Sequence, residues 1–132
     1  MSTFREAVHA SEQESTQGML GLLVYALLLE KTPLWNEDAG GRIARIGEHI
    51  GYYAELERQN KVFLAGPFVD DPDHPDGMIL LKVASEAEAH EIAQGDIFHV
   101  LKYRTYRVRP WLINKGALDL SVHFSDRSFN LA

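Results

Sequence analysis

The stretch Met19-Leu-Gly-Leu-Leu-Val-Tyr-Ala-Leu-Leu-Leu-Glu30 decides the fold, because it contains the longest apolar run of the chain. A run this apolar is typical of a central strand that is buried on both faces of its sheet. A buried helix is the competing interpretation, since leucine favours helices. The run is too short to span a bilayer, which takes about 20 residues. Three glutamates among the residues that precede it argue against a secretory signal peptide.

A helix is predicted over residues 37–59, after this run. Apolar side chains recur there at every third or fourth position and form one stripe along the helix. They belong to Ile43, Ile46, Ile50 and Tyr53. Asn36 or Asp38 is placed to cap the start of this helix.

The next segment predicts a pair of strands. Residues 61–68 and 78–84 are strand-like, and residues 69–77 between them form a turn-rich loop. Pro67 cannot donate a backbone hydrogen bond, so it marks an end, an edge or a bulge of its strand. The acidic loop is interpreted as a solvated hairpin loop, because its spacing does not fit a calcium-binding EF-hand. Its polar residues are Asp70, Asp71, Asp73, His74 and Asp76.

A second helix and a fourth strand complete the pattern. Ser85, with Glu88 three residues later, has the spacing of a capping box and begins a helix over residues 86–94. Residues 102–109 alternate between polar and apolar side chains, as in a strand with one solvated face.

The order of these elements is the split βαβ pattern of a ferredoxin-like α+β fold. It predicts a four-stranded antiparallel sheet with both helices on one face. The other face needs a cover, which a face-to-face homodimer would supply. We therefore divide the chain into an N-terminal arm (1–18), a ferredoxin-like domain (19–114) and a C-terminal extension (115–132) with one added strand.

Composition narrows the classes of function. A chain of 132 residues with a net charge of −6 and no Lys/Arg-rich run is expected to bind neither nucleic acid nor a membrane. The absence of cysteine rules out disulfides, thiolate catalysis and cysteine metal sites, and it fits a cytoplasmic location. No metal site and no cofactor are expected.

His49 and Asp96 are the strongest candidates for chemistry. His49 lies near the edge of the apolar stripe of the first predicted helix, and Asp96 follows Gly95 at the end of the second. If both helices cover one sheet face, the two side chains can meet, and the carboxylate then holds one ring nitrogen while the other transfers a proton. The alternatives are a structural histidine and a turn-forming aspartate.

Other side chains are candidates for substrate contacts. The aromatic residues either line an aromatic-binding cavity or belong to the core and a dimer interface; they are Trp35, Phe68, Phe98 and Trp111. Hydroxyl donors are offered by Tyr25, Tyr52 and Tyr53. Arg42 or Arg45 is suited to stabilise an enolate or a carboxylate, and His99 either joins the pocket or faces solvent.

Four short motifs in their order and spacing resemble the YciI-related family of small ferredoxin-like proteins. The resemblance covers about residues 20–113, and Ile97 departs from the proline usual at its position in the family. The motifs are His49 with Tyr52-Tyr53, Ala65-Gly66-Pro67, Ser85-Glu86-Ala87 and Asp96-Ile97-Phe98.

This resemblance implies a dimeric α+β barrel in which His49 and Asp96 form the active-site pair. One branch of the family eliminates chloride from a chlorinated hydroxyhydroquinone, so a cofactor-free lyase or isomerase acting on a small cyclic or aromatic substrate is implied. The side chains expected to contact this substrate are Arg45, Tyr25, Tyr53, Pro67, Phe68 and Phe98.

Two other hypotheses remain open from the sequence. The first is a non-catalytic homodimer that binds a small molecule or a protein. The second is a domain that works beside a larger enzyme and uses its terminal extensions as docking arms. A buried His49 with no adjoining cavity would favour the first of them over the enzyme, and loss of dimerisation or partner binding on trimming residues 1–17 would support the second.

Overall fold

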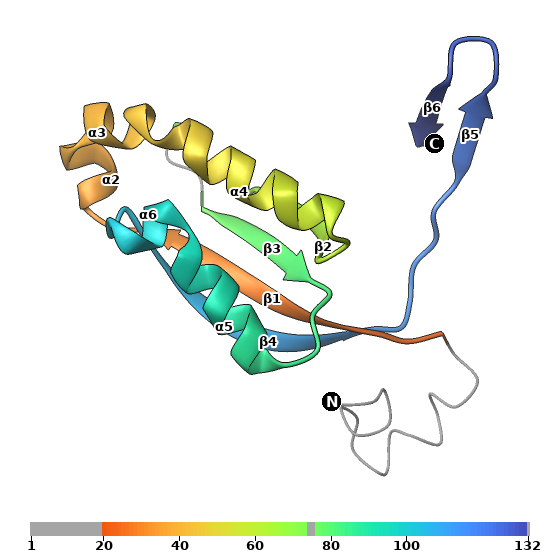
Figure 1. The fold of residues 1–132 in the computed structure, drawn as a ribbon, viewed down its shortest axis with the longest axis horizontal. Coiled ribbons are helices and arrows are strands. Elements are labelled where there is room, and N and C mark those ends of the chain that lie inside the picture. Colours follow the sequence, from red (N-terminus) through yellow and green to blue (C-terminus); the bar gives the residue numbers. More distant parts are fainter. Residues whose placement is uncertain (1–19, 74–75, 132) are drawn as a thin grey trace.

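The computed structural model describes residues 20–73 and 76–131, so the expected N-terminal arm and His74 lie outside the described residues. Figure 1 shows an α+β body and a separate C-terminal hairpin. The elements in chain order are β1 (Leu22–Lys31), α2 (Leu34–Glu37), α3 (Ala39–Ala44), α4 (Ile46–Arg58), β2 (Val62–Pro67), β3 (Gly77–Leu81), α5 (Glu86–Gly95), α6 (Ile97–Val100), β4 (Arg104–Ile113), β5 (Leu120–His123) and β6 (Ser128–Leu131).

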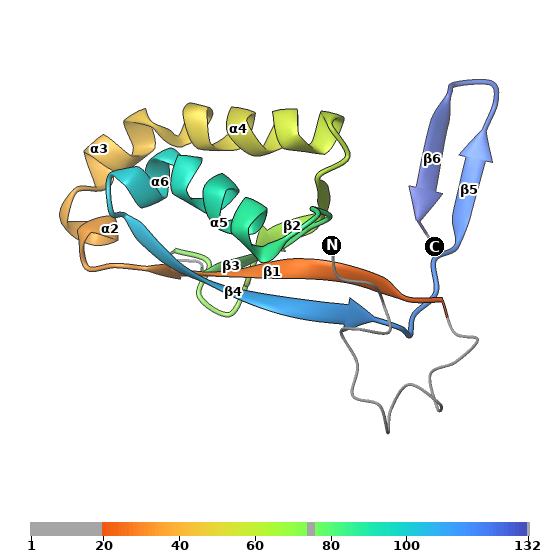
Figure 2. The same cartoon turned by 60° about the horizontal axis from the view of Figure 1, so that its bottom comes forward.

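The body is a four-stranded antiparallel sheet in the order β2-β3-β1-β4, which confirms the ferredoxin-like α+β prediction. The apolar run near the N-terminus forms the central strand β1, so its interpretation as a helix was wrong. Helices α4 and α5 cover the same face of this sheet (Figure 2). This shared face is what allows a residue of α4 to meet a residue at the end of α5.

Side chains of β1 alternate between two apolar surfaces, as expected of a central strand. Tyr25, Leu27 and Leu29 face the helices and form the main core with residues of α4 and α5. Val24 and Ala26 belong to a second cluster on the opposite face, which we call the outer sheet face. No helix among the described residues covers that face (Figure 2).

The first predicted helix is divided into three, which corrects the prediction of one continuous helix over 37–59. Asp38 interrupts the helical backbone between α2 and α3, and its carboxylate accepts a hydrogen bond from the backbone N–H of Gly41 at 3.2 Å. Arg45 has the non-helical angles φ −108° and ψ 2° and separates α3 from α4. Asp38 therefore caps a helix, as predicted. The helix that it caps is the short α3, which comes before α4.

The isoleucine stripe on this segment does not enter the core, which is a second correction. Ile43, Ile46 and Ile50 are 42–60% exposed, whereas the buried residue of α4 is Leu56. The helix is thus turned so that its isoleucines flank an opening in the protein surface. His49 was expected at the boundary of the stripe, and its side chain is half-way between buried and exposed, at 16% exposure.

The second predicted helix begins as expected. The Ser85 hydroxyl accepts a hydrogen bond from the Glu88 backbone at 3.1 Å, and the Glu88 carboxylate accepts one from the backbone N–H of Ala84 at 3.1 Å. After α5, Asp96 starts the additional short helix α6, which the sequence pattern did not predict.

The C-terminal extension contains two strands, where one was expected. Among the described residues, strands β5 and β6 pair only with each other, and the hairpin projects from the body (Figures 1 and 2). Its paired residues Leu120–Leu131 and Val122–Phe129 lie on one face. These four apolar residues are 60–69% exposed. Within the described residues, no helix is long and apolar enough to cross a membrane.

Candidate active site

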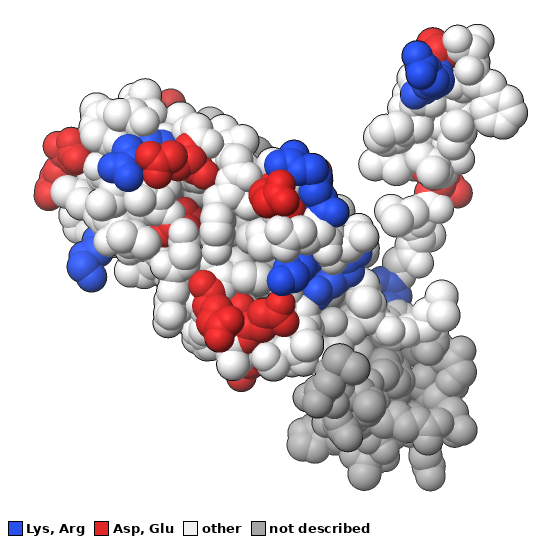
Figure 3. Space-filling model, in the orientation of Figure 1, with Lys and Arg blue, Asp and Glu red and all other residues white. Residues whose placement is uncertain are grey.

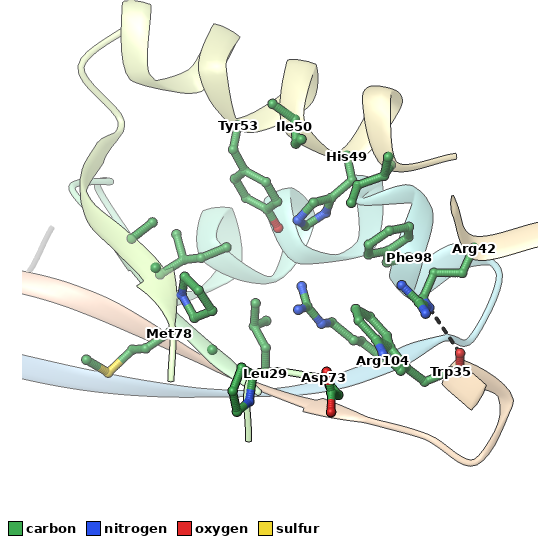
Figure 4. Close-up of a pocket in the computed structure, with 17 residues that line it drawn as sticks. Leu29, Trp35, Arg42, His49, Ile50, Tyr53, Asp73, Met78, Phe98 and Arg104 are labelled. Atoms are coloured by element: carbon green, nitrogen blue, oxygen red, sulfur yellow. Dashed lines mark hydrogen bonds between the residues drawn. The ribbon is translucent and has the colours of Figure 1, made fainter. Parts of the chain in front are cut away.

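A pocket of about 670 Å³ opens between α4 and the sheet. Residues of α4 form one wall, and the end of β2, the start of β3 and the start of β4 form the others. Figure 4 shows His49 and Tyr53 projecting from α4 toward Arg104 and Leu29 on the sheet, with Trp35 and Phe98 at one end. The lining is mostly apolar, and its few polar groups come together below α4.

His49 and Asp96 are in direct contact, as the sequence permitted. The His49 Nδ1 atom lies 3.0 Å from Asp96 Oδ1 and 3.1 Å from Oδ2. The His49 side chain is 16% exposed and lines the pocket, whereas Asp96 is fully buried behind it. Because Nδ1 faces the carboxylate, Nε2 is the ring nitrogen left to meet a ligand.

Asp96 owes its position to the end of one helix and the start of the next. Its backbone ends α5, and its Oδ1 atom accepts a hydrogen bond from the backbone N–H of Phe98 at 2.9 Å, which caps α6. The Tyr53 hydroxyl donates to Oδ2 at 2.9 Å. A carboxylate at the C-terminus of a helix is disfavoured by the helix dipole, so these donors and His49 explain why it is held there.

The charge of Asp96 is stabilised against its burial. Burial alone raises the pKa of this carboxyl, but the hydrogen bond and charge of His49 and the Phe98 N–H outweigh it. The pKa of Asp96 therefore lies below its ordinary value, and the group is an anion at neutral pH. An anion in this place orients the imidazole.

The histidine ring is held by aromatic contacts on two sides. It stacks on Phe98 with ring centroids 4.5 Å apart and planes 10° apart, and it meets Tyr53 edge-on at 5.3 Å. Burial and the charge of Asp96 raise the pKa of the Tyr53 hydroxyl. Tyr53 thus stays a protonated donor to Asp96 and fixes the carboxylate rather than transferring its own proton.

Three of the six predicted substrate contacts lie in the pocket lining. These are Tyr53, Pro67 and Phe98. The other three do not line this pocket, which corrects their expected placement. Tyr25 is buried in the core beneath the helices, and Phe68, just beyond β2, is about half exposed. Arg45 lies in the break before α4, where its guanidinium binds Glu48 at 2.7 Å.

Several lining residues were missed or undervalued. Arg104 opens β4 on the helix-facing side of the sheet and lines the pocket, and Trp35 is buried there against Phe98. The alternation of β4 carried a signal for Arg104, because it has the same parity as Tyr106 and Val108, which pack against the core. Of the two arginines suggested near the first helix, Arg42 is the one at the pocket.

His99 neither joins the pocket lining nor faces solvent. Its side chain is 5% exposed, and Nδ1 donates to the backbone carbonyl of Ala93 at 2.6 Å. Burial lowers the pKa of this imidazole. In the acidic loop, Asp76 accepts a hydrogen bond from the backbone N–H of Lys31 at 3.0 Å, which ties the loop to β1. Among the described residues, no group of acidic or histidine side chains is arranged to hold a metal ion.

Comparison with known proteins supports the fold. No family model matches the chain, and no curated protein matches it. Among solved structures it is similar to 5-chloro-2-hydroxyhydroquinone dehydrochlorinase from Burkholderia phenoliruptrix AC1100, seen in complex with 2,5-dihydroxybenzoquinone. The identity is 20%, the match covers 67% of this chain and 92% of that chain, and the TM-score is 0.55. At this identity the likeness shows a common fold, and a third of this chain lies outside it.

Proposed function

We propose that the protein is an enzyme in which His49, held by Asp96, transfers a proton on a small cyclic or aromatic substrate. The observation that carries the proposal is the contact of 3.0 Å between His49 Nδ1 and a fully buried, ionised Asp96 beside an open pocket. A carboxylate that fixes one imidazole nitrogen and leaves the other for a ligand is the arrangement of a general base.

Elimination and isomerisation both follow from this arrangement. In an elimination, Nε2 of His49 accepts a substrate proton, and the electron pair of the broken bond forms the new double bond as the leaving group departs with its own pair. In an isomerisation, the same nitrogen returns the proton to another atom of the substrate. In both cases the imidazolium forms against the Asp96 carboxylate, which stabilises it.

The shape of the pocket favours a planar ring. Its volume of about 670 Å³ is within the range of small-molecule sites, and its lining includes Trp35, Phe98 and Tyr53. The protein that shares this fold is named for the dehydrochlorination of a chlorinated hydroxyhydroquinone. The short motifs that resemble the YciI-related family include both members of the pair, which adds to the case for a lyase or isomerase.

We also propose that the protein acts as a homodimer. On the outer sheet face Val24, Ala26 and Leu80 are themselves only 0–5% exposed, so the apolar surface that a partner could cover beside them is that of Trp111, which is 47% exposed. The C-terminal hairpin offers a second exposed apolar surface, largely uncharged in Figure 3. Two-stranded hairpins are marginally stable alone in water, so a second copy that covers both surfaces accounts for their composition.

The competing function is a homodimer that binds a small molecule without converting it. The pocket and the dimer surfaces are as consistent with a binding protein as with an enzyme. Only the pairing of His49 with Asp96 favours catalysis. A binding protein gains nothing from a buried carboxylate behind its histidine, whereas such a carboxylate orients the ring of a general base and stabilises the imidazolium that forms.

The test is turnover of substituted hydroquinones and quinones by wild type, His49→Asn and Asp96→Asn. We expect activity in the wild type that falls by about 10²- to 10⁴-fold in each variant, as is usual when a general base is lost. His123→Gln, in the exposed hairpin, is the matched control and should retain activity. Equal activity in wild type and His49→Asn would show that His49 is not the base.

A further inference from the structure

The pocket is larger than the single ring that the proposed chemistry needs. Its volume is about 670 Å³, whereas a cavity of roughly 150 Å³ is enough to hold a benzene ring. A ring that reaches His49 therefore fills only one part of the pocket. Figure 4 shows Trp35 and Phe98 on one side of the pocket and Met78 on the other, with His49 between them.

The part of the pocket near Met78 lies over the end of β2 and the start of β3. Directly opposite residues of an antiparallel pair share one face of the sheet. Ala65 is opposite Ile79, and Pro67 is opposite Gly77. Ile79 belongs to the core cluster beneath the helices, so both pairs face the helices. We call this part the apolar compartment and define it by four lining residues, Ile50, Ala65, Pro67 and Ile79.

The compartment exists because the helix-facing side chains become smaller toward this end of the two strands. Farther along the sheet, Val62 is opposite Leu81, and both pack in or against the core. At the following helix-facing positions, Ala65 carries only a methyl group and Gly77 has no side chain. Small residues can also serve close packing of a helix on a sheet, but Ala65 and Pro67 are exposed. The space above them is therefore part of the pocket and is not filled by α4.

The wall of the compartment on α4 is apolar as well. Ile50 lines the pocket from this helix and is 59% exposed. All four residues that define the compartment have side chains made only of carbon and hydrogen. A concave surface of this kind binds a hydrocarbon group by releasing water from apolar area on both partners, with no need for a hydrogen bond.

We infer that the apolar compartment is a subsite for a hydrocarbon substituent of several carbons, so that the substrate is a ring with such a side group and not a bare ring. The ring lies toward His49, and its substituent lies over Ala65 and Pro67 and below Ile50. The inference rests on the proposed function for its catalytic meaning, but ligand binding tests it separately.

The subsite has a consequence for the choice of the reacting atom. A bare ring can turn in a pocket of this size, whereas a ring with its substituent in the compartment presents one edge to Nε2 of His49. Binding energy from a part of the substrate that does not react is then used to orient the part that does. The compartment therefore affects both which ligand binds and which proton is removed.

The experiment is an NMR titration of the full chain with three probes: phenol, 4-ethylphenol and 4-butylphenol. They share one ring and one hydroxyl group and differ only in the length of the alkyl group. We expect each pair of added carbons to tighten binding by about tenfold, because each buried methylene adds a similar gain. The methyl signals of Ile50 and Ile79 should shift with 4-butylphenol, because these side chains border the compartment.

Two variants and two controls locate the effect. Ala65→Leu extends a side chain into the compartment, so affinity should no longer rise with alkyl length, while phenol binding should stay within about twofold of wild type. Ile50→Asn replaces an exposed residue and should weaken 4-butylphenol binding at least about threefold. Gly51→Leu adds the same side chain on the open surface of α4, and there the rise should persist. It should also persist in His49→Asn.

The results separate the subsite from the proposed enzyme. Affinity that does not rise with alkyl length in wild type, or a rise that survives in Ala65→Leu, overturns the subsite. Shifts confined to the C-terminal hairpin also overturn it, because the alkyl group then binds the exposed apolar face there. If Ala65→Leu does not fold, unchanged 4-butylphenol binding by Ile50→Asn has the same meaning. A rise with alkyl length in a protein whose turnover does not depend on His49 contradicts the enzyme and leaves the subsite standing.

Discussion

Replacing Asp96 by asparagine tests whether the buried carboxylate organises the site. In the folded protein Asp96 accepts hydrogen bonds from His49, Tyr53 and the Phe98 backbone. An asparagine amide has one oxygen acceptor and turns an NH₂ donor toward the remaining partners, so at least one buried donor loses its acceptor. With charge-assisted bonds replaced by neutral ones as well, we expect a loss of about 2–4 kcal/mol in the free energy of unfolding.

The pH dependence of this loss identifies its cause. The pKa of folded Asp96 lies below the ordinary value of 3.8, so the ionised carboxylate contributes stability that is complete above that value. This contribution disappears as the pH falls through the lower pKa of the folded state. The stability difference between wild type and Asp96→Asn should accordingly be largest near neutral pH and shrink in acid.

The assay is urea denaturation followed by tryptophan fluorescence, from about pH 7 down to about pH 3. Asp126→Asn is the control, because this exposed carboxylate also accepts hydrogen bonds, from Ser128, and its loss should cost much less than the loss of the Asp96 carboxylate. Nitrogen NMR of His49 adds a direct readout, since the neutral ring should carry its proton on Nδ1 in the wild type only. If wild type and Asp96→Asn were equally stable at neutral pH, the stabilising role assigned to the Asp96 carboxylate would be refuted.

Two further predictions concern the close packing of Gly95 against Tyr52 and the exposed apolar face of the C-terminal hairpin. Gly95→Ala should lose about 1–2 kcal/mol, because a Cβ there would collide with the Tyr52 hydroxyl, which donates to the Ile92 carbonyl at 2.8 Å. Gly51→Ala, in α4 with open space around it, should instead gain about 0.5–1 kcal/mol, and thermal unfolding distinguishes the two. In the hairpin, Phe129→Asp should weaken self-association at least about tenfold in sedimentation experiments, whereas Ser121→Asp on the polar face should not. A wild-type chain that stays monomeric at high concentration would contradict the dimer.

The sequence predicted the sheet well because its strands carry strong local patterns. The apolar run became β1 and the alternating segment became β4. Both patterns match the side chains of these strands that lie in or against the core clusters. The capping pattern at Ser85 was equally local. The break at Arg45 was not, because no proline or turn motif marks the residue at which the backbone leaves the helical conformation.

The contact between His49 and Asp96 could be predicted from the sequence as a possibility. The isoleucines of α4 show why the pocket beside this contact could not be predicted. A histidine and an aspartate at the ends of helices on one sheet face can be brought together by topology alone. Whether Ile46 and Ile50 fill the core or border a pocket depends on the rotation of α4, which an apolar stripe does not specify.

The rotation of α4 also determines which side chains line the pocket. With the isoleucines turned outward, His49 and Tyr53 occupy the underside of α4, and Arg104 on β4 lies across from them. The exposed isoleucines therefore accompany an inward-facing histidine, and the apolar area that they leave in contact with solvent contributes less stability than it would in the core.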